Sequence, residues 1–291
     1  MKAPPFAYVR AGSLADVFAL WSAAGPDAKL LAGGQSLLAT LAFRLSEPST
    51  LIDISRVAEL AGISAVGDGI RVGALTTHAE LGASDLVRRH APLLAEAVPL
   101  IAHPAIRNRG TIGGSLAYAD PAAELPACVV ALDATIVARS ATGERRIPAA
   151  QFFTGLYATA LADNELIAAV ELSARKPQER AVILELARRS GDYAMAGIAA
   201  RAQVSGGTLV DPRLVFFGVG AAPVTATAAM AALAGKSATP DTIAHAQAAL
   251  DADLDPPADL HGGPDMKRYL ARVLLARALT RLTGAEEARA A

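Results

Sequence analysis

The chain contains a single cysteine, Cys128, among its 291 residues. One thiol cannot build a disulfide framework, and it cannot hold an iron–sulfur cluster or a zinc ion that needs several thiolates. Histidine is also scarce, with five residues, and no cluster of carboxylates lies close to them in the sequence, so no metal site is expected. If this protein handles electrons, its own cofactor is organic, or the metal lies on a partner.

Excess charge and long apolar runs are absent as well. The formal net charge is -1, which argues against a nucleic acid or an anionic membrane as partner. No uncharged apolar run reaches the roughly 18–20 residues of a membrane-spanning helix, so none is expected. Residues 1–6 lack the apolar stretch of a signal peptide. These absences together predict a cytoplasmic protein.

The abundant residues are apolar. Hydrophobic residues make up 53% of the chain and charged residues 19%, which is enough for a sizeable core and argues against disorder. Single cores stop growing at roughly 250–300 residues, so a chain of this length is expected to hold more than one domain.

The first glycine pair lies in a small α/β unit. Residues 13–24 have the apolar spacing of a helix, with Ser13 as its N-cap. A strand at 29–32, a helix at 37–45 and a strand at 50–55 follow. Between the first strand and the helix, Ala32, Gly33, Gly34, Gln35, Ser36 and Leu37 form a glycine turn, where free N–H groups and the helix dipole favour a phosphate. The alternative is a tight turn that binds nothing.

A second glycine pair occupies the centre of the chain, in the stretch Gly110, Thr111, Ile112, Gly113, Gly114 and Ser115. Adjacent glycines flanked by hydroxyl groups leave the backbone open to an oxygen-rich ligand. Arg107 and Arg109, just upstream, would attract an anion. We interpret the two pairs as two walls of one dinucleotide site. Neither pair has the spacing of a Walker A loop or of a Rossmann G-x-G-x-x-G turn.

Two carboxylates follow the second glycine pair. Asp120 is expected to cap a helix with Pro121 at its first position, and Glu124 lies one turn further on the same face. Near the glycine turns, both could accept hydrogen bonds from sugar hydroxyls. Simple helix capping is the alternative.

The later part of the chain is expected to begin near residues 175–180, a polar stretch that contains proline. Before it, strands are expected at 134–139, 145–147 and 165–172. After it, strands at 181–187, 195–204 and 213–220 precede helices at 224–234, 241–251 and 265–282. Strands followed by helices in blocks indicate an α+β domain.

These motifs, in this order, resemble the FAD-binding middle subunit of molybdenum hydroxylases of the carbon monoxide dehydrogenase and xanthine dehydrogenase type. The resemblance covers nearly the whole chain and includes both glycine turns, the stretch 120–127 and the loop 191–194. It implies an α+β fold in which a two-part FAD-binding domain of the vanillyl-alcohol-oxidase type precedes a C-terminal α+β domain with an antiparallel sheet and helices. The domains would be 1–176, with subdomains 1–55 and 56–176, and 177–291.

The resemblance also assigns roles to residues. Ala32 to Leu37 would wrap the FAD pyrophosphate, and Gly110, Thr111, Gly113, Gly114 and Ser115 would do so from the other side. Glu124, with Asp120 nearby, would bind the flavin's sugar or ribityl chain. Ile101 and Ile167 would line the cofactor. Tyr193 would lie near the isoalloxazine ring, although it could equally be an exposed loop tyrosine.

The sequence departs from the family pattern at three positions. Gln35 stands where carbon monoxide dehydrogenases usually carry His, and Ser115 where Asn is common. Glu185 replaces the Lys of several relatives, which changes the local charge. Gln35 and Ser115 remain polar, so we still expect FAD to bind.

The function implied by the resemblance is electron transfer. Electrons from [2Fe–2S] clusters on a small subunit, supplied by a large molybdopterin subunit, would reach FAD on this chain and leave to an external acceptor, in a heterotrimeric oxidoreductase. No residue of the chain is expected to be catalytic, because no nucleophile–base set is apparent. A stand-alone flavin-dependent oxidoreductase and a non-catalytic nucleotide-binding protein are the alternatives.

Overall fold

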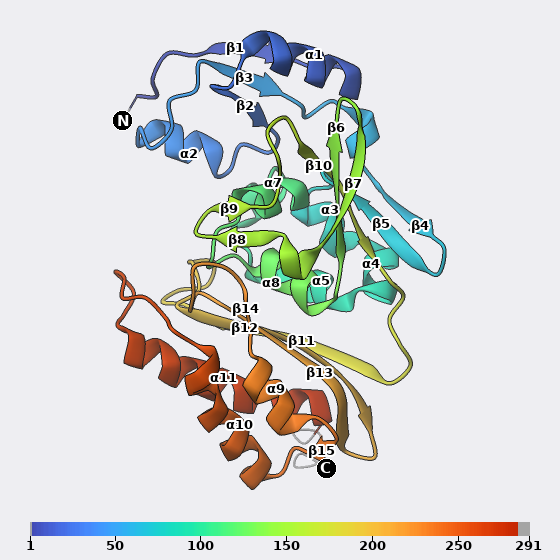
Figure 1. Ribbon diagram of the computed structural model, residues 1–291, viewed down its shortest axis with the longest axis vertical. Helices are drawn as coiled ribbons and strands as arrows, with labels where there is room; N and C mark the ends of the chain where they lie inside the picture. The colour runs from blue at the N-terminus through green and yellow to red at the C-terminus, as the bar shows by residue number, and fades with distance from the viewer. Residues whose placement is uncertain (1, 285–291) are drawn as a thin grey trace.

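Residues 2–284 of the chain are described by the computed structural model, and they form three larger sheets with helices between and beside them (Figure 1). The N-terminal sheet lies at one end of the long axis and the C-terminal helices at the other. No helix among these residues combines the length and the hydrophobicity that crossing a bilayer requires.

The N-terminal sheet is the α/β unit expected from the sequence. Its strands are parallel and lie in the order β1-β3-β2, because each connection crosses back through a helix. Asp16 N donates to Ser13 Oγ at 3.1 Å, which confirms Ser13 as the N-cap. The elements are β1 (Ala7–Arg10), α1 (Leu14–Ala24), β2 (Ala28–Leu31), α2 (Leu37–Ala42) and β3 (Thr50–Asp53).

The helix expected over 37–45 is shorter in the structure. It ends at Ala42, and Arg44 adopts a left-handed backbone conformation with φ of 56°. Leu45 is consequently 77% exposed, although its spacing matches the buried Leu41. An apolar repeat predicts which face a helix buries, but it does not show where the helix ends.

The second sheet is antiparallel, with strand order β4-β5-β10-β6-β7, and short helices cover one of its faces. A hairpin turn at residues 67–69 connects β4 to β5. Its strands are β4 (Ile63–Val66), β5 (Gly69–Gly73), β6 (Thr135–Ser140), β7 (Gly143–Pro148) and β10 (Leu166–Leu172), and β8 (Phe153–Gly155) and β9 (Ala158–Thr159) form a separate hairpin. The helices are η1 (Ala58–Leu60), α3 (His78–Ala83), α4 (Asp85–His90), α5 (Pro92–Ala97), η2 (Val98–Leu100), α6 (Pro104–Arg107), α7 (Ile112–Tyr118), α8 (Glu124–Ala131) and η3 (Ala149–Gln151).

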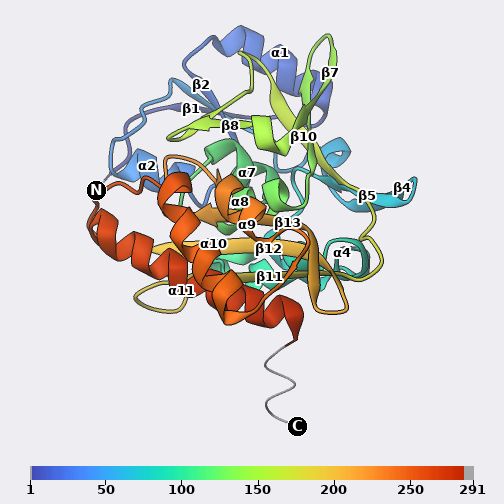
Figure 2. The ribbon, with the colours of Figure 1, turned by 60° about the horizontal axis from the view of Figure 1, so that its bottom comes forward.

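The third sheet has long antiparallel strands with helices on one face (Figure 2). A tight turn at residues 205–207 joins β12 to β13, and both of its glycines have positive φ. The following strand starts at Thr208, earlier than the expected 213, because the tight turn pairs the two strands from their first residues. The elements are β11 (Glu179–Leu186), β12 (Ala196–Ser205), β13 (Thr208–Phe217), β14 (Val224–Thr225), α9 (Thr227–Leu233), β15 (Lys236–Ser237), α10 (Pro240–Asp253) and α11 (Pro264–Thr283).

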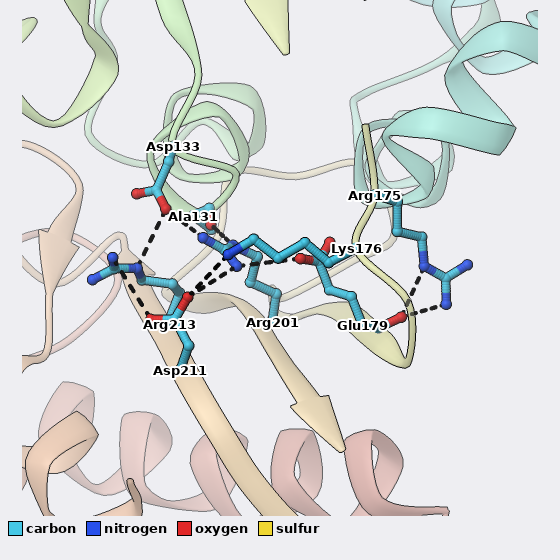
Figure 3. A network of polar contacts seen from close by, with 8 residues as sticks. All are labelled: Ala131, Asp133, Arg175, Lys176, Glu179, Arg201, Asp211 and Arg213. Carbon is cyan, nitrogen blue, oxygen red and sulfur yellow. Dashed lines mark hydrogen bonds and ion pairs between the residues drawn. The ribbon is translucent and has the colours of Figure 1, made fainter. Parts of the chain in front are cut away.

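Helices α5 and α8 lie between the second and third sheets. Their apolar residues share one core with Ile183, Val215 and Phe217 of the third sheet. A polar network at the end of α8 also joins the two sheets: Arg201 lies at its centre and is 4% exposed (Figure 3). The third sheet is therefore attached to the second through both apolar and ionic contacts.

Candidate flavin site

The two glycine-containing segments are in direct contact. Residues 32–37 are called the first corner, and residues 110–115 the second corner. A methyl group placed on Gly33 would lie 2.0 Å from the carbonyl oxygen of Arg109 and 2.9 Å from Gly110 Cα. No side chain fits between the two backbones, so glycine is required at residue 33. The structure thus brings together the two segments that the sequence pointed to, although they are far apart along the chain.

The first corner offers a row of unused donors. Within residues 2–284, the backbone N–H groups of Gly33, Gly34, Gln35, Ser36 and Leu37 donate to no protein acceptor. Gly34 has φ of +73°, a left-handed conformation that helps turn successive N–H groups to one side. Ser36 precedes α2 without making a side-chain cap. This is the arrangement that binds a phosphate group.

The second corner is built differently from the expectation. It forms the first turn of α7, and its N–H groups are already used: Ile112 donates to Thr76 O, Gly113 to Ala74 O, and Gly114 to the N-cap oxygen Thr111 Oγ1 at 3.1 Å. This corner therefore offers mainly close backbone approach at Gly114 and the hydroxyl of Ser115. The anion-binding donors are concentrated on the first corner.

The two arginines upstream of this corner have separate roles. Arg107 Nη1 donates to the carbonyl oxygens of Ile101 and Ala102, at 2.9 and 3.0 Å, and so holds the turn that leads into α6. Both hydrogens of Nη1 are therefore used inside the protein. Arg109 is exposed and lines a cleft of about 450 Å³ beside Gly33.

The rest of that cleft was not anticipated. It lies at the carboxyl ends of β1 and β3, where open parallel sheets commonly bind ligands. Arg10, Asp53 and Arg56 contribute to it. For Asp53 and Arg56 the available signal was their position at the end of the predicted strand 50–55, which by itself does not distinguish a binding residue from a capping one. No strand was predicted before Arg10, so no sequence signal pointed to it.

Asp120 and Glu124 follow the end of α7, the helix that begins with the second corner. Ala119, with φ of 53°, ends α7 in a left-handed conformation and turns the chain. Asp120 Oδ1 accepts a hydrogen bond from Ala122 N at 2.9 Å, but α8 starts at Glu124 with Ala123 as its N-cap, so the expectation of Asp120 as N-cap is wrong. Asp120 forms the turn before the helix instead.

Burial changes the proton affinity of both carboxyl groups. It raises the pKa of Asp120, and it raises the pKa of Glu124 to about 8, with Glu185 and Asp120 adding repulsion. Partial desolvation and nearby like charge both favour the neutral form of a carboxyl group. At neutral pH Glu124 thus carries a proton, and it can donate as well as accept a hydrogen bond.

Tyrosines gather near these carboxyl groups. The rings of Tyr118 and Tyr157 meet edge to face, with centroids 5.2 Å apart. Tyr193 comes from the third-sheet side, and its pKa is raised by partial burial and by Asp120, Tyr118 and Glu124. It is 60% exposed, which fits both a cover for a flat ring and a loop tyrosine. The resemblance pointed to Tyr193, whose role stays a prediction. Sequence reasoning did not single out Tyr118 and Tyr157, because their partners are distant in sequence.

Ile101 and Ile167 lie in one core, the core that also holds α5 and α8. They are 8% and 5% exposed. Both are therefore core residues, and whether they touch a cofactor stays a prediction.

Comparisons with known proteins agree with this geometry. Residues 4–174 match the family model "FAD binding domain in molybdopterin dehydrogenase", and residues 182–282 match the "CO dehydrogenase flavoprotein C-terminal domain". The chain belongs to the FAD-binding medium subunits of the molybdenum hydroxylases. The predictions of this family, of its fold and of FAD as the cofactor are confirmed.

Relatives match over nearly their full length. The chain is 40% identical to the alpha subunit of the 6-hydroxypseudooxynicotine dehydrogenase complex of Paenarthrobacter nicotinovorans, covering 97% of this chain and 95% of the relative. It is 38% identical to the carbon monoxide dehydrogenase medium chain of Hydrogenophaga pseudoflava, covering 96% and 97%. These relatives are subunits of dehydrogenases, so this chain is an oxidoreductase flavoprotein component, and the stand-alone alternative is not favoured.

Solved structures show the same fold. A carbon monoxide dehydrogenase from H. pseudoflava that lacks the Mo-pyranopterin moiety of its cofactor superimposes with a TM-score of 0.93 at 40% identity, covering 96% of this chain and 98% of that chain. Quinoline 2-oxidoreductase from Pseudomonas putida 86 gives a TM-score of 0.92 at 37% identity, covering 98% and 99%. The family's electron-transfer role therefore applies to this chain, as the sequence predicted.

Proposed function

We propose that this chain binds FAD across the contact between its two glycine corners and carries electrons within a three-subunit molybdenum hydroxylase. The observation that supports this most directly is the row of five backbone N–H groups, from Gly33 to Leu37, without a protein acceptor in residues 2–284. A diphosphate supplies the acceptor oxygens that such a row requires. The residues would be Ala32, Gly33, Gly34, Gln35, Ser36 and Leu37 on one side, and Gly110, Thr111, Gly113, Gly114 and Ser115 on the other.

The remaining predicted residues would orient the flavin. Asp120 and Glu124 would bind the sugar or ribityl hydroxyls, since their carboxyl groups lie directly after the second corner. Tyr193 would cover the ring from the C-terminal part, and Ile101 and Ile167 would support it from below. When bound, a flavin accepts electrons singly and releases them as a pair. The chain contributes position, exclusion of water and local charge.

The partners follow from the family. We place two [2Fe–2S] clusters on a small subunit and the molybdopterin cofactor on a large one, because this chain has a single cysteine, Cys128, which is buried. The acceptor is external. We propose the cytoplasm as the location, and a division of the chain near residue 176 into the FAD-binding and C-terminal domains.

The test uses the full chain and the complex purified from its source organism. The isolated chain is expected to bind about one FAD, with the absorption of an oxidised flavin, and to oxidise no organic substrate. The complex is expected to contain iron and molybdenum besides the flavin. A colourless middle chain in an intact complex would contradict the proposal. So would an isolated chain that turns over an organic substrate.

A further inference from the structure

The cleft of about 450 Å³ beside the contact between the two corners is mostly separate from the residues proposed to bind FAD. It is formed by the carboxyl ends of β1 and β3 and by the segment that leads into α7. The first corner contributes Ala32 and Gly33 to it and the second corner Thr111, whereas residues 34–37 and 113–115 do not line it. Its volume is within the range of pockets that hold small molecules.

One arginine of the cleft is paired with the only carboxylate that lines it. Arg10 Nε donates to Asp53 Oδ2 at 3.0 Å, and Arg10 Nη2 donates to Tyr8 Oη at 2.8 Å. The Asp53 side chain also accepts hydrogen bonds from the Tyr8 hydroxyl and, at 2.8 Å, from Ser55 N. The positive charge of Arg10 is therefore balanced inside the protein.

The other two arginines of the cleft, Arg56 and Arg109, have no such partner. Both are exposed, and within residues 2–284 neither side chain makes an ion pair or a hydrogen bond to the protein. The hydroxyl of Ser55 and the amide of Asn108 line the same cleft, and in this part of the chain they make no hydrogen bond either. Because the Arg10 pair is neutral, the cleft has two unbalanced positive charges with two neutral polar groups beside them.

These groups match a phosphate monoester better than a carboxylate. Near neutral pH a phosphate monoester carries a charge of about −1.5 to −2 and three strong acceptor oxygens. Two guanidinium groups balance this charge, and their planar forks fit phosphate oxygens. A carboxylate has a single charge, so it would leave one arginine unmatched. Ala32 and Leu75 provide an apolar part of the wall for a small organic group.

We infer that this cleft binds a small phosphate monoester at a site separate from the FAD site. Arg56 and Arg109 would bind the phosphate oxygens, and the Ser55 hydroxyl and the Asn108 amide would donate the remaining hydrogen bonds. Arg10 would remain paired with Asp53 and form the back of the site.

The test is calorimetric titration of the full chain saturated with FAD. The probes are glycerol 3-phosphate, which is a small phosphate monoester, and inorganic phosphate, which contains only the shared group. Acetate is the control for a single negative charge, and glycerol is the control for the organic part. We expect one phosphate-binding site per chain and much weaker binding of both controls. No binding of either probe, or equal affinity for acetate, would overturn the inference.

Variants of the two unpaired arginines locate the site. R56Q and R109Q should each weaken the binding of glycerol 3-phosphate about tenfold or more, because each removes charge-assisted hydrogen bonds. R56K keeps the charge without the planar fork, so it should retain part of the affinity. R89Q is the matched control, because Arg89 is exposed on α4 and does not line the cleft. Unchanged affinity in R56Q and R109Q, or an equal loss in R89Q, would contradict the assignment.

A parallel titration of the full chain without FAD distinguishes this inference from the proposed function. Glycerol 3-phosphate is expected to bind in both states. If saturation with FAD abolishes this binding, the dinucleotide itself occupies the cleft and a separate site is refuted. If the chain fails to bind FAD but still binds glycerol 3-phosphate, the proposed function fails and the phosphate site stands.

Discussion

Arg201 Nε donates to the carbonyl oxygen of Ala131 at 2.6 Å, and this bond ties β12 to the last turn of α8 (Figure 3). The same guanidinium pairs with Asp133 and Glu179, so all of its buried charge is matched. Removal of Arg201 leaves the buried Glu179 carboxylate without its cation, and an uncompensated buried charge costs about 3–5 kcal/mol in comparable cases. We expect R201A to lower the free energy of unfolding by that amount, measured by urea titration.

Arg213 provides the control for this prediction. It pairs with the same Asp133 but is 36% exposed, and exposed ion pairs contribute about 0–1 kcal/mol. R213A should therefore be nearly neutral. Equal losses in R201A and R213A would show that burial of Arg201 does not determine its contribution.

The contact between the two glycine corners can be tested with one methyl group. In G33A the added carbon would lie 2.0 Å from Arg109 O, so the corners must move apart and the row of N–H donors must shift. We expect FAD affinity to fall about tenfold or more, equivalent to about 1.4 kcal/mol. G143A is the matched control, because a methyl there meets nothing within 4 Å. Titration of the full chain with FAD gives both affinities, and unchanged affinity in G33A would contradict the placement.

Gly114 tests the second corner. A side chain at this residue would lie 2.9 Å from Thr111 Oγ1, the cap of α7, and would cover the backbone that a ligand approaches. We expect G114V to lose its flavin while the third sheet and its helices stay folded. Flavin absorbance reports the first outcome and limited proteolysis the second. A normal flavin content in G114V would refute the assignment of this corner.

Glu124 predicts a pH dependence of stability. In the unfolded chain Glu124 loses its proton near its ordinary pKa of 4.5. In the folded chain burial raises this pKa to about 8. Between these values the folded state binds more protons, so the free energy of unfolding falls as pH rises through this window. E124Q should flatten that slope in urea titrations at a series of pH values. E47Q, at an exposed position, is the control and should keep the wild-type slope.

Local patterns predicted the fold well, because they are read from neighbouring residues. The cap at Ser13 and the glycine turn after β2 both depend on short-range geometry. Helix ends were less certain: α2 stops at Ala42 because Arg44 turns left-handed, and no residue type at that position signals the change.

The arrangement of the site depends on contacts between residues that are far apart in the sequence. The sequence could suggest that both glycine pairs bind one ligand, but not that the first pair supplies the free N–H groups while the second uses its own inside the protein. Arg107 was expected to attract an anion, and the structure shows that its Nη1 holds the carbonyl groups of Ile101 and Ala102. Such differences depend on which hydrogen-bond acceptors the folded chain brings close to each donor, and the sequence alone does not show these contacts.

The hydrogen bond from Gly218 N to Pro121 O, together with the one from Lys267 Nζ to Gly218 O, links α11 to the segment that presents Asp120. Truncation of the chain to its FAD-binding part alone would remove both hydrogen bonds, along with Tyr193 and Glu185. A fragment that keeps both glycine corners but omits the last third would therefore expose Asp120 and Glu124, the residues proposed to bind the ribityl chain, to water. We therefore expect that the smallest fragment able to retain FAD is the whole chain.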